Sequence, residues 1–126
     1  MAGGSGGSSG RSPGDNHDLS AQPLRRRLSR TDGDYIGKPG GRGRRARHIR
    51  KLPIDEYEPE SFFADLAEGG REREGTSYPG RLVELPGVGT MGLRPPEAEK
   101  PYTMDVNING IRINEWKFVD REDYEA

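Results

Sequence analysis

One histidine, one arginine and one aspartate in this chain have the residue types that proton transfer beside a phosphate requires. His48 lies among arginines, Arg94 ends an apolar strand pattern, and Asp105 lies in the next strand pattern. An imidazole or a carboxylate can move a proton, and a guanidinium stabilises charge that develops on phosphate oxygens. These types suit phosphodiester cleavage without a metal, and they favour RNA because its 2′-hydroxyl is an internal nucleophile. The candidate catalytic residues are therefore His48, Asp105 and Arg94.

Basic residues around this constellation are candidates for binding a substrate. Residues 34–50 interleave arginines with Tyr35 and a histidine, and such a surface can neutralise phosphates while its rings stack on bases. A structural alternative stays open, since Arg- and Gly-rich segments also serve solubility, and Asp105 with Arg112 can form a surface pair worth less than about 1 kcal/mol. The candidate substrate-binding residues are Arg44, Arg45, Arg47, Arg50, Arg112 and Lys117.

The sequence contains no motif that indicates a metal site or a cofactor site. The chain has no cysteine, and His17 and His48 are too far apart to form a local metal motif. A Gly-rich phosphate loop, a His-Glu metal helix and a nucleophile elbow are all missing from the pattern. We therefore expect neither a metal site nor a cofactor.

The charge of the chain is distributed unevenly. Residues 1–50 carry a net charge of +7, whereas residues 51–126 carry −8. This asymmetry indicates a basic segment that contacts a polyanion such as nucleic acid, or one that folds back on the acidic part. Neither a membrane-length apolar run nor a secretory signal is present. We expect no membrane partner, and a location in the cytoplasm or outside the cell by a route without a classical signal peptide.

Composition restricts the size of the folded domain. Hydrophobic residues make up 29% of the chain, which also contains 19 Gly and 10 Pro, so the core must be small. Residues 1–33 are predicted to be a disordered arm rich in Gly, Ser and Arg. A short basic helix over residues 24–30 would be marginal in isolation. Residues 34–126 are predicted to form a small α+β domain.

The clearest strand pattern extends from Tyr102 to Asp120. Apolar and polar residues alternate before Asn109-Gly110, a dipeptide that predicts a two-residue hairpin with a type I′ turn. Past this turn the apolar positions change from odd to even numbers, at Trp116 and Phe118. A β-bulge near Asn114-Glu115 would keep both rings on the core face.

Two further elements complete the predicted fold. A helix is predicted from Pro59 to Glu68, with Phe62, Phe63 and Leu66 on its buried side. A second hairpin joins residues 81–85 to residues 90–94. The predicted fold class is α+β, a small antiparallel four-stranded sheet with one helix.

Five short motifs follow one another between residues 34 and 119. They are YIGKPG (Tyr35 to Gly40), RHIRKLP (Arg47 to Pro53), a Phe-Phe helix ending in Gly (Ser61 to Gly69), LRP (Leu93 to Pro95) and MDVNINGI with EWKFV (Met104 to Val119). This order resembles the C-terminal toxin modules of bacterial polymorphic toxins, the modules carried by LXG and Rhs-type proteins.

The resemblance implies a nuclease. Arg47, His48, Arg94 and Asp105 match the motif positions that would act, nucleic acid would be the substrate, and a cognate immunity protein would be a partner. The chain departs from the pattern twice, because residues 95–101 replace a Ser-rich loop and the closing His falls at Lys117 or Trp116. If that His carries the proton in the family, this chain is either inactive or uses Lys117 only through its charge.

Two hypotheses follow. The first is a nucleic-acid-targeting module of toxin type, a metal-independent nuclease that acts on RNA rather than DNA. The alternative is a non-enzymatic binding or accessory protein, including one related to phage, whose basic flexible arm holds nucleic acid or a protein partner. Turnover in the presence of EDTA distinguishes the two.

Overall fold

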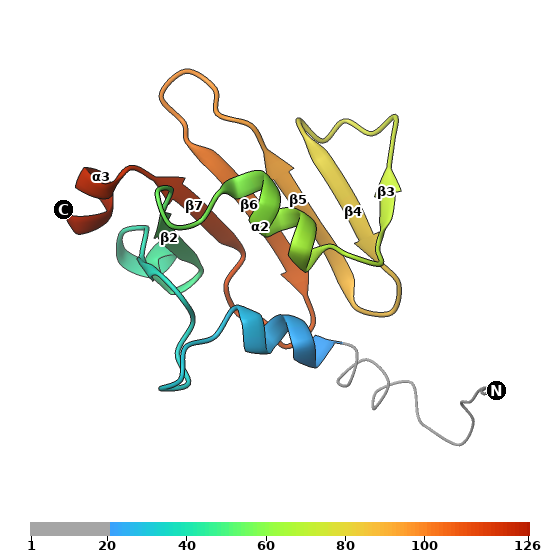
Figure 1. The fold of residues 1–126 in the computed structure, drawn as a ribbon, viewed down its shortest axis with the longest axis horizontal. Helices are drawn as coiled ribbons and strands as arrows, with labels where there is room; N and C mark the ends of the chain where they lie inside the picture. Colours follow the sequence, from blue (N-terminus) through green and yellow to red (C-terminus); the bar gives the residue numbers. More distant parts are fainter. Residues whose placement is uncertain (1–20) are drawn as a thin grey trace.

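The computed structural model describes residues 21–126 of the chain. A β-sheet forms its centre, with helices packed against it (Figure 1). The strands in this part of the chain are β1 (Lys38–Pro39), β2 (Ile49–Pro53), β3 (Arg71–Arg73), β4 (Arg81–Leu85), β5 (Gly89–Arg94), β6 (Tyr102–Ile108) and β7 (Glu115–Val119). The helical segments are residues 21–27, the 3-10 helix η1 (Gly43–Arg47), α2 (Pro59–Leu66) and α3 (Arg121–Glu125).

The sheet is mixed and larger than the sequence predicted. Residues 21–126 contribute seven strands in the order β1-β2-β7-β6-β5-β4-β3. β2 and β7 are parallel, and the other neighbours are antiparallel. The prediction of a small antiparallel four-stranded sheet with one helix is therefore wrong.

The missed strands lack the alternation that reveals a strand in a sequence. β3 consists of three charged, exposed residues, and β1 is only two residues long. In β2, one position on the core face is occupied by Arg50, which is 6% exposed. An arginine at a core position breaks the apolar pattern, so the strand resembles part of a basic loop.

Residues 21–33, which the sequence assigned to a disordered arm, are ordered and packed on the sheet. Ala21, Leu24 and Leu28 belong to the hydrophobic core, and Leu28 is fully buried. The sheet supplies the tertiary contacts that a short helix needs for stability. The rest of the predicted arm, residues 1–20, lies outside the described residues. No helix within residues 21–126 is long and apolar enough to cross a membrane.

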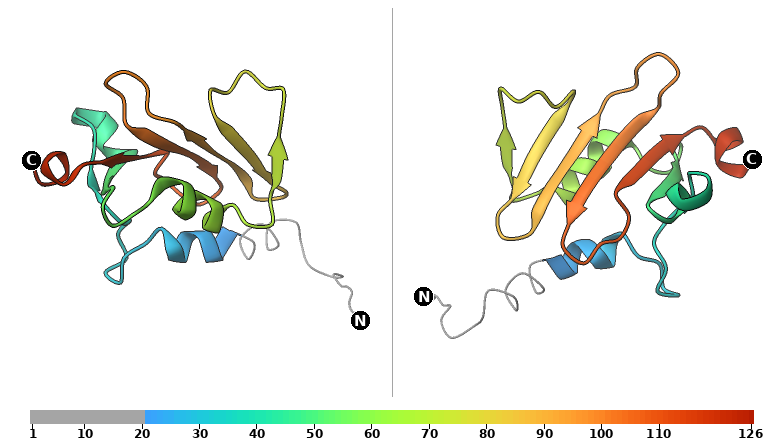
Figure 2. Two further views of the ribbon diagram at one scale, coloured as in Figure 1. Left: turned by 45° about the horizontal axis from the view of Figure 1, so that its top comes forward. Right: turned by 180° about the vertical axis from the view of Figure 1, so that it is seen from behind.

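The two faces of the sheet differ because strand side chains alternate between them. Helix 21–27 and α2 lie on the same side of the sheet, and no helix of residues 21–126 covers the opposite face of β5 and β6 (Figure 2). Phe63 and Leu66 of α2 join the core on the covered side. The strand residues of the hydrophobic core cluster are Leu52, Val83, Leu85, Met91, Leu93, Met104, Val106, Ile108, Trp116 and Phe118.

α2 begins at Pro59, as its sequence predicts, but it ends at Leu66, two residues before the predicted end at Glu68. Pro59 occupies the first turn, and the carboxylate of Glu58 accepts hydrogen bonds from the backbone N–H groups of Ser61 (2.9 Å) and Glu60 (3.2 Å). These backbone donors lower the pKa of Glu58 below its usual value. Gly69, with φ of +87°, follows the helix.

The closing hairpin keeps its rings in the core by the predicted change of parity. Trp116 and Phe118 are buried together with Ile111 and Ile113, as expected. The predicted two-residue loop is wrong, because β6 ends at Ile108 and β7 begins only at Glu115, so that six residues connect the two strands. The turn type is different, because Gly110 has a φ of +86° whereas Ala98 is the only non-glycine with a positive φ in the described residues. A type I′ turn needs positive φ at both central positions, so that prediction is wrong.

Candidate active site on the open face of the sheet

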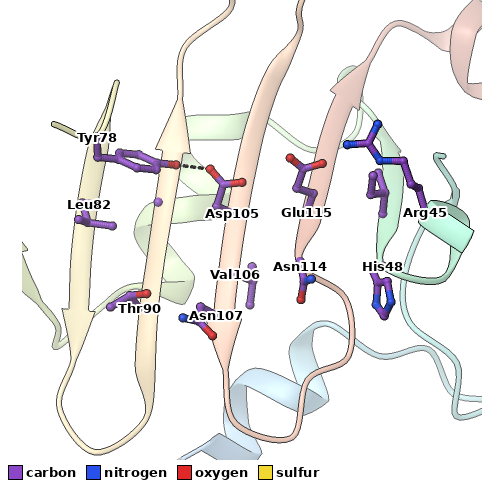
Figure 3. Close-up of a pocket in the computed structure, with 12 residues that line it drawn as sticks. Arg45, His48, Tyr78, Leu82, Thr90, Asp105, Val106, Asn107, Asn114 and Glu115 are labelled. Carbon is purple, nitrogen blue, oxygen red and sulfur yellow. Dashed lines mark hydrogen bonds between the residues drawn. The ribbon is translucent and has the colours of Figure 1, made fainter.

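A cavity of about 640 Å³ lies on the open face of the sheet. Its floor is formed by β5, β6 and β7, with Tyr78 from the β3–β4 loop at one side and the η1 region at the other (Figure 3). The lining residues are Arg45, His48, Ile49, Tyr78, Leu82, Thr90, Gly92, Asp105, Val106, Asn107, Asn114 and Glu115.

Strand register places two carboxylates next to each other on the cavity floor. Asp105 of β6 lies opposite Gly92 of β5 on one side and opposite Glu115 of β7 on the other. The ring of Tyr78 lies where a side chain at Gly92 would have to be, since any Cβ there would collide with it. The missing side chain lets the hydroxyl of Tyr78 donate a 2.5 Å hydrogen bond to Oδ2 of Asp105.

Arg94 links the two carboxylates. Its Nε and Nη2 donate to Oδ2 (2.7 Å) and Oδ1 (2.9 Å) of Asp105, and Nη2 also donates to Oε2 of Glu115 (2.8 Å). Both oxygens of Asp105 are therefore engaged. Oε1 of Glu115 accepts no hydrogen bond from the described residues, so it is the carboxylate oxygen available to a ligand.

The network carries one more negative than positive charge. About a third of each side chain in the Arg94–Asp105 pair is exposed, and slightly less of Glu115, so solvent screens the pairs only in part. The hydrogen bond to Asp105 raises the pKa of Arg94. Burial, and then the hydrogen bond to the Asp105 carboxylate, raise the pKa of Tyr78 well above its usual value, so this hydroxyl remains a donor.

His48 lies at the opposite end of the cavity, where η1 leads into β2. Its backbone carbonyl accepts hydrogen bonds from the N–H groups of Asn114 (2.8 Å) and Glu115 (3.2 Å). Its Nδ1 lies 3.3 Å from the carbonyl oxygen of Arg112. A carbonyl only accepts, so Nδ1 carries the proton in this contact, and Nε2 is left to exchange a proton with a ligand.

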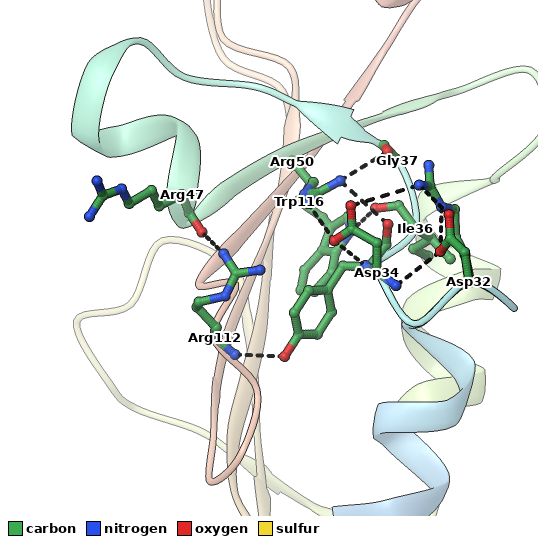
Figure 4. Close-up of polar contacts among 10 residues, drawn as sticks. Asp32, Asp34, Ile36, Gly37, Arg47, Arg50, Arg112 and Trp116 are labelled. Carbon is green, nitrogen blue, oxygen red and sulfur yellow. Dashed lines mark hydrogen bonds and ion pairs between the residues drawn. The ribbon is translucent and has the colours of Figure 1, made fainter.

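The predicted substrate-binding residues of η1 are exposed around this end of the cavity. Arg45 lines the cavity near Glu115 (Figure 3), whereas Arg44 and Arg47 do not line it. The side chain of Arg47 points away from Arg112, although the Arg47 carbonyl accepts a 2.7 Å hydrogen bond from Arg112 Nη1 (Figure 4). The guanidinium of Arg112 also lies over the ring of Tyr35, at 5.3 Å.

Arg50 lies on the core face of β2, away from the cavity. Its Nη2 donates to Oδ1 of Asp34 (2.9 Å), and its Nη1 donates to the carbonyl of Gly37 (3.2 Å), as Figure 4 shows. Its Nε is buried without a partner. These contacts fix the segment before β2 against Trp116, whose indole N–H donates to the carbonyl of Ile36 (3.2 Å). The structure therefore places Arg50 in a supporting position and not at the cavity.

Lys117 also lies outside the cavity. It is on the open face of β7, opposite Lys51 and Thr103, and lines a separate hollow of about 390 Å³ with Asp120 and Asp123. The candidate catalytic residues His48 and Asp105 do share the main cavity, and Arg94 is bound to Asp105 at its floor.

Sequence reasoning missed two members of the site. Glu115 was missed because the predicted two-residue turn at Asn109-Gly110 places Asn114 opposite Asp105, whereas the structure pairs Asp105 with Glu115. The predicted bulge carried the signal, since it moves Glu115 into register with Asp105. Tyr78 lies in a Gly- and Pro-containing loop without periodicity, and its closeness to Asp105 depends on the missing side chain of Gly92.

Within residues 21–126 no group of three or more His, Asp and Glu residues is arranged to hold a metal ion. Comparison of the chain with family models, with curated proteins and with solved structures found no match. The function must therefore be inferred from the side chains of the cavity.

Proposed function

We propose that this chain is a nucleic-acid-targeting module of the polymorphic-toxin type that cleaves RNA without a metal ion. One observation supports this most strongly. A single cavity contains an imidazole, a carboxylate oxygen with no internal partner, and an arginine, from His48, Glu115 and Arg45. Two proton-transfer groups and a cation beside the phosphate are what RNA transesterification requires.

The rim of the cavity suits a polyanion. Arg42, Arg44, Arg45 and Arg47 are exposed in and next to η1, and none of them forms an ion pair within the described residues. An RNA strand crossing η1 would exchange counterions for these guanidinium groups. Arg45 would bring one phosphate to the cavity, where the strand's ribose meets the floor.

The reaction is a transfer within the RNA strand. Glu115 Oε1 takes the proton of the 2′-hydroxyl, and the 2′-oxygen forms a bond to phosphorus while the bond from phosphorus to the 5′-oxygen breaks. His48 donates the Nε2 proton of its charged form to that 5′-oxygen. The products are a 2′,3′-cyclic phosphate and a 5′-hydroxyl, so DNA, which has no 2′-hydroxyl, is not cleaved.

Asp105 and Arg94 act in this scheme as positioning residues. Both Asp105 oxygens are bound by Arg94 and Tyr78, so Asp105 is less suited to proton transfer than Glu115. Arg94 holds Oε2 of Glu115 and so directs Oε1 toward the ligand. This assignment moves the carboxylate role from Asp105, the sequence candidate, to its neighbour on β7.

Incubation of the purified chain with RNA and with DNA in EDTA tests the proposal. We expect RNA fragments with cyclic phosphate ends, and a loss of rate of about 10²- to 10⁴-fold in a His48→Ala variant. Lys117→Ala, which removes an open-face cation outside the cavity, should keep the rate within a few fold. Absence of RNA cleavage by the unmodified chain would contradict the proposal.

The unpaired arginines of η1 also favour the second candidate, a nucleic-acid-binding protein without turnover. In that case binding weakens steeply with salt, and a variant with Arg42, Arg44 and Arg45 changed to Ala loses affinity. No product forms at any enzyme concentration, which separates this function from the first.

A further inference from the structure

The cavity contains a second set of polar groups that the proposed reaction does not use. Thr90, Asn107 and Asn114 lie side by side below the charged row of Tyr78 and Asp105 (Figure 3). Thr90 and Asn107 are cross-strand partners on the open face of β5 and β6. These three side chains form what we call the amide row, which is uncharged and rich in donors and acceptors.

The side chains of the amide row are not used in hydrogen bonds within the described part of the fold. The backbone of Asn114 is fixed, because its N–H donates to the carbonyl of His48 (2.8 Å) and its carbonyl accepts from Val106 N–H (2.8 Å). The side chains of Thr90, Asn107 and Asn114 form no hydrogen bond with other described residues. Both asparagines are exposed to solvent. Their amide groups are therefore held at the cavity but left to water or a ligand.

Apolar surface lies next to these amides. Ile49 is a buried residue that lines the cavity, and Leu82 is partly buried there. The ring of Tyr78, which covers the floor at Gly92, adds aromatic surface to the cavity. A flat heterocycle can pack against such apolar surface while its polar edge meets an amide, which presents one acceptor and two donors side by side.

We infer that the amide row binds the base of the nucleotide whose phosphate is cleaved, through paired donor and acceptor bonds to the base edge. This inference rests on the proposed function. Asparagine pairs with bases in two-bond geometry, and its amide can turn to present donor or acceptor first. The subsite therefore accepts amino-bearing and carbonyl-bearing bases alike, but it rejects a ribose phosphate that has no base.

Nucleotide binding tests the inference without requiring turnover. In ¹H–¹⁵N spectra, the side-chain amide signals of Asn107 and Asn114 should move when 5′-CMP or 5′-UMP is added. They should stay in place with ribose 5-phosphate at the same concentration. Asn109, on the turn outside the cavity, supplies a control amide that should not move. Equal shifts with ribose 5-phosphate and with 5′-CMP would overturn the base subsite.

Substitutions make the test quantitative. Asn107→Ala and Asn114→Ala should each weaken 5′-CMP binding by about tenfold and leave ribose 5-phosphate binding unchanged, whereas Asn109→Ala should alter neither. Asn107→Asp replaces an adaptable amide with a group that only accepts. It should favour cytosine, with its amino group, over uracil by about tenfold. The inference is wrong if Asn107→Ala and Asn107→Asp leave both nucleotides bound as before.

The two proposals can fail separately. Nucleotide binding through the amide row without RNA cleavage would contradict the proposed reaction and keep the base subsite. RNA cleavage with the same rate in Asn107→Ala, Asn114→Ala and the unmodified chain would keep the reaction and refute the subsite.

Discussion

Two arginines bound to carboxylates lie on opposite faces of this sheet, and they differ in burial and in the number of carboxylates that they contact. Arg50 is on the core face, 6% exposed, and its partner Asp34 is the only carboxylate it contacts in the described residues. Arg94 is on the open face, about a third exposed, between Asp105 and Glu115. The first pair fixes a segment of chain. The second leaves a surplus carboxylate oxygen, Oε1 of Glu115, which faces the cavity and has no hydrogen-bond partner in the described residues.

The largest expected effect is on activity, from changing that surplus oxygen. Glu115→Gln keeps the shape and an acceptor for Arg94, but an amide cannot take a proton. RNA cleavage in EDTA should fall by about 10²- to 10⁴-fold, with the free energy of unfolding nearly unchanged. Glu84→Gln is the matched control, because Glu84 pairs with Arg73 on the same face outside the cavity. Equal loss in both variants would remove Glu115 from the reaction.

A matched pair of substitutions compares the two arginines directly. Arg94→Met leaves two adjacent, half-buried carboxylates without their cation, and should lower the free energy of unfolding by about 2–3 kcal/mol at pH 7. Arg50→Met fills a similar volume and removes the buried Nε without a partner, while Asp34 is exposed enough to be hydrated. It should cost less than about 1 kcal/mol. Urea unfolding measures both, and the opposite ranking would refute the comparison.

The contribution of Tyr78 to the free energy of unfolding should decrease at alkaline pH. Its folded pKa is raised, so its contribution to stability is fully present below the unfolded value of about 10 and is lost as the pH rises above it. Tyr78→Phe should cost about 1 kcal/mol at pH 8 and less at pH 10.5. Tyr57→Phe is the control, because the Tyr57 hydroxyl has no hydrogen bond within the described residues. A pH-independent cost in Tyr78→Phe would contradict this expectation.

The contribution of Asp34 to the free energy of unfolding should decrease slightly at acid pH. The backbone N–H of Tyr35, and then the charge of Arg50, lower the pKa of Asp34. Its contribution is therefore present above the usual carboxyl value and is lost as the pH falls through the lowered one. The midpoint temperature of thermal unfolding should fall less steeply between pH 5 and pH 2.5 in Asp34→Asn than in the unmodified chain. Identical slopes would show that the pair adds no acid dependence.

Local patterns predicted the elements whose side chains alternate, and long-range pairing decided the rest. The β4–β5 hairpin and α2 were predictable because Val83, Met91 and Phe63 follow the periods of strand and helix. β2 was not, because an arginine fills its core position and its parallel partner β7 lies far along the chain. The site could not be predicted in full for two reasons. A shift of one residue in strand register places Glu115 opposite Asp105, and the lack of a side chain at Gly92 lets Tyr78 approach Asp105.

The parallel pairing of β2 with β7 also governs the order in which the site can be completed. Glu115 becomes a neighbour of Asp105 only when the last strand inserts between β2 and β6. A nascent chain in which β7 has not yet been synthesised therefore lacks the strand between β2 and β6, and it lacks the pair of adjacent carboxylates. The reaction proposed for this site would therefore require nearly the whole described sequence to have been synthesised.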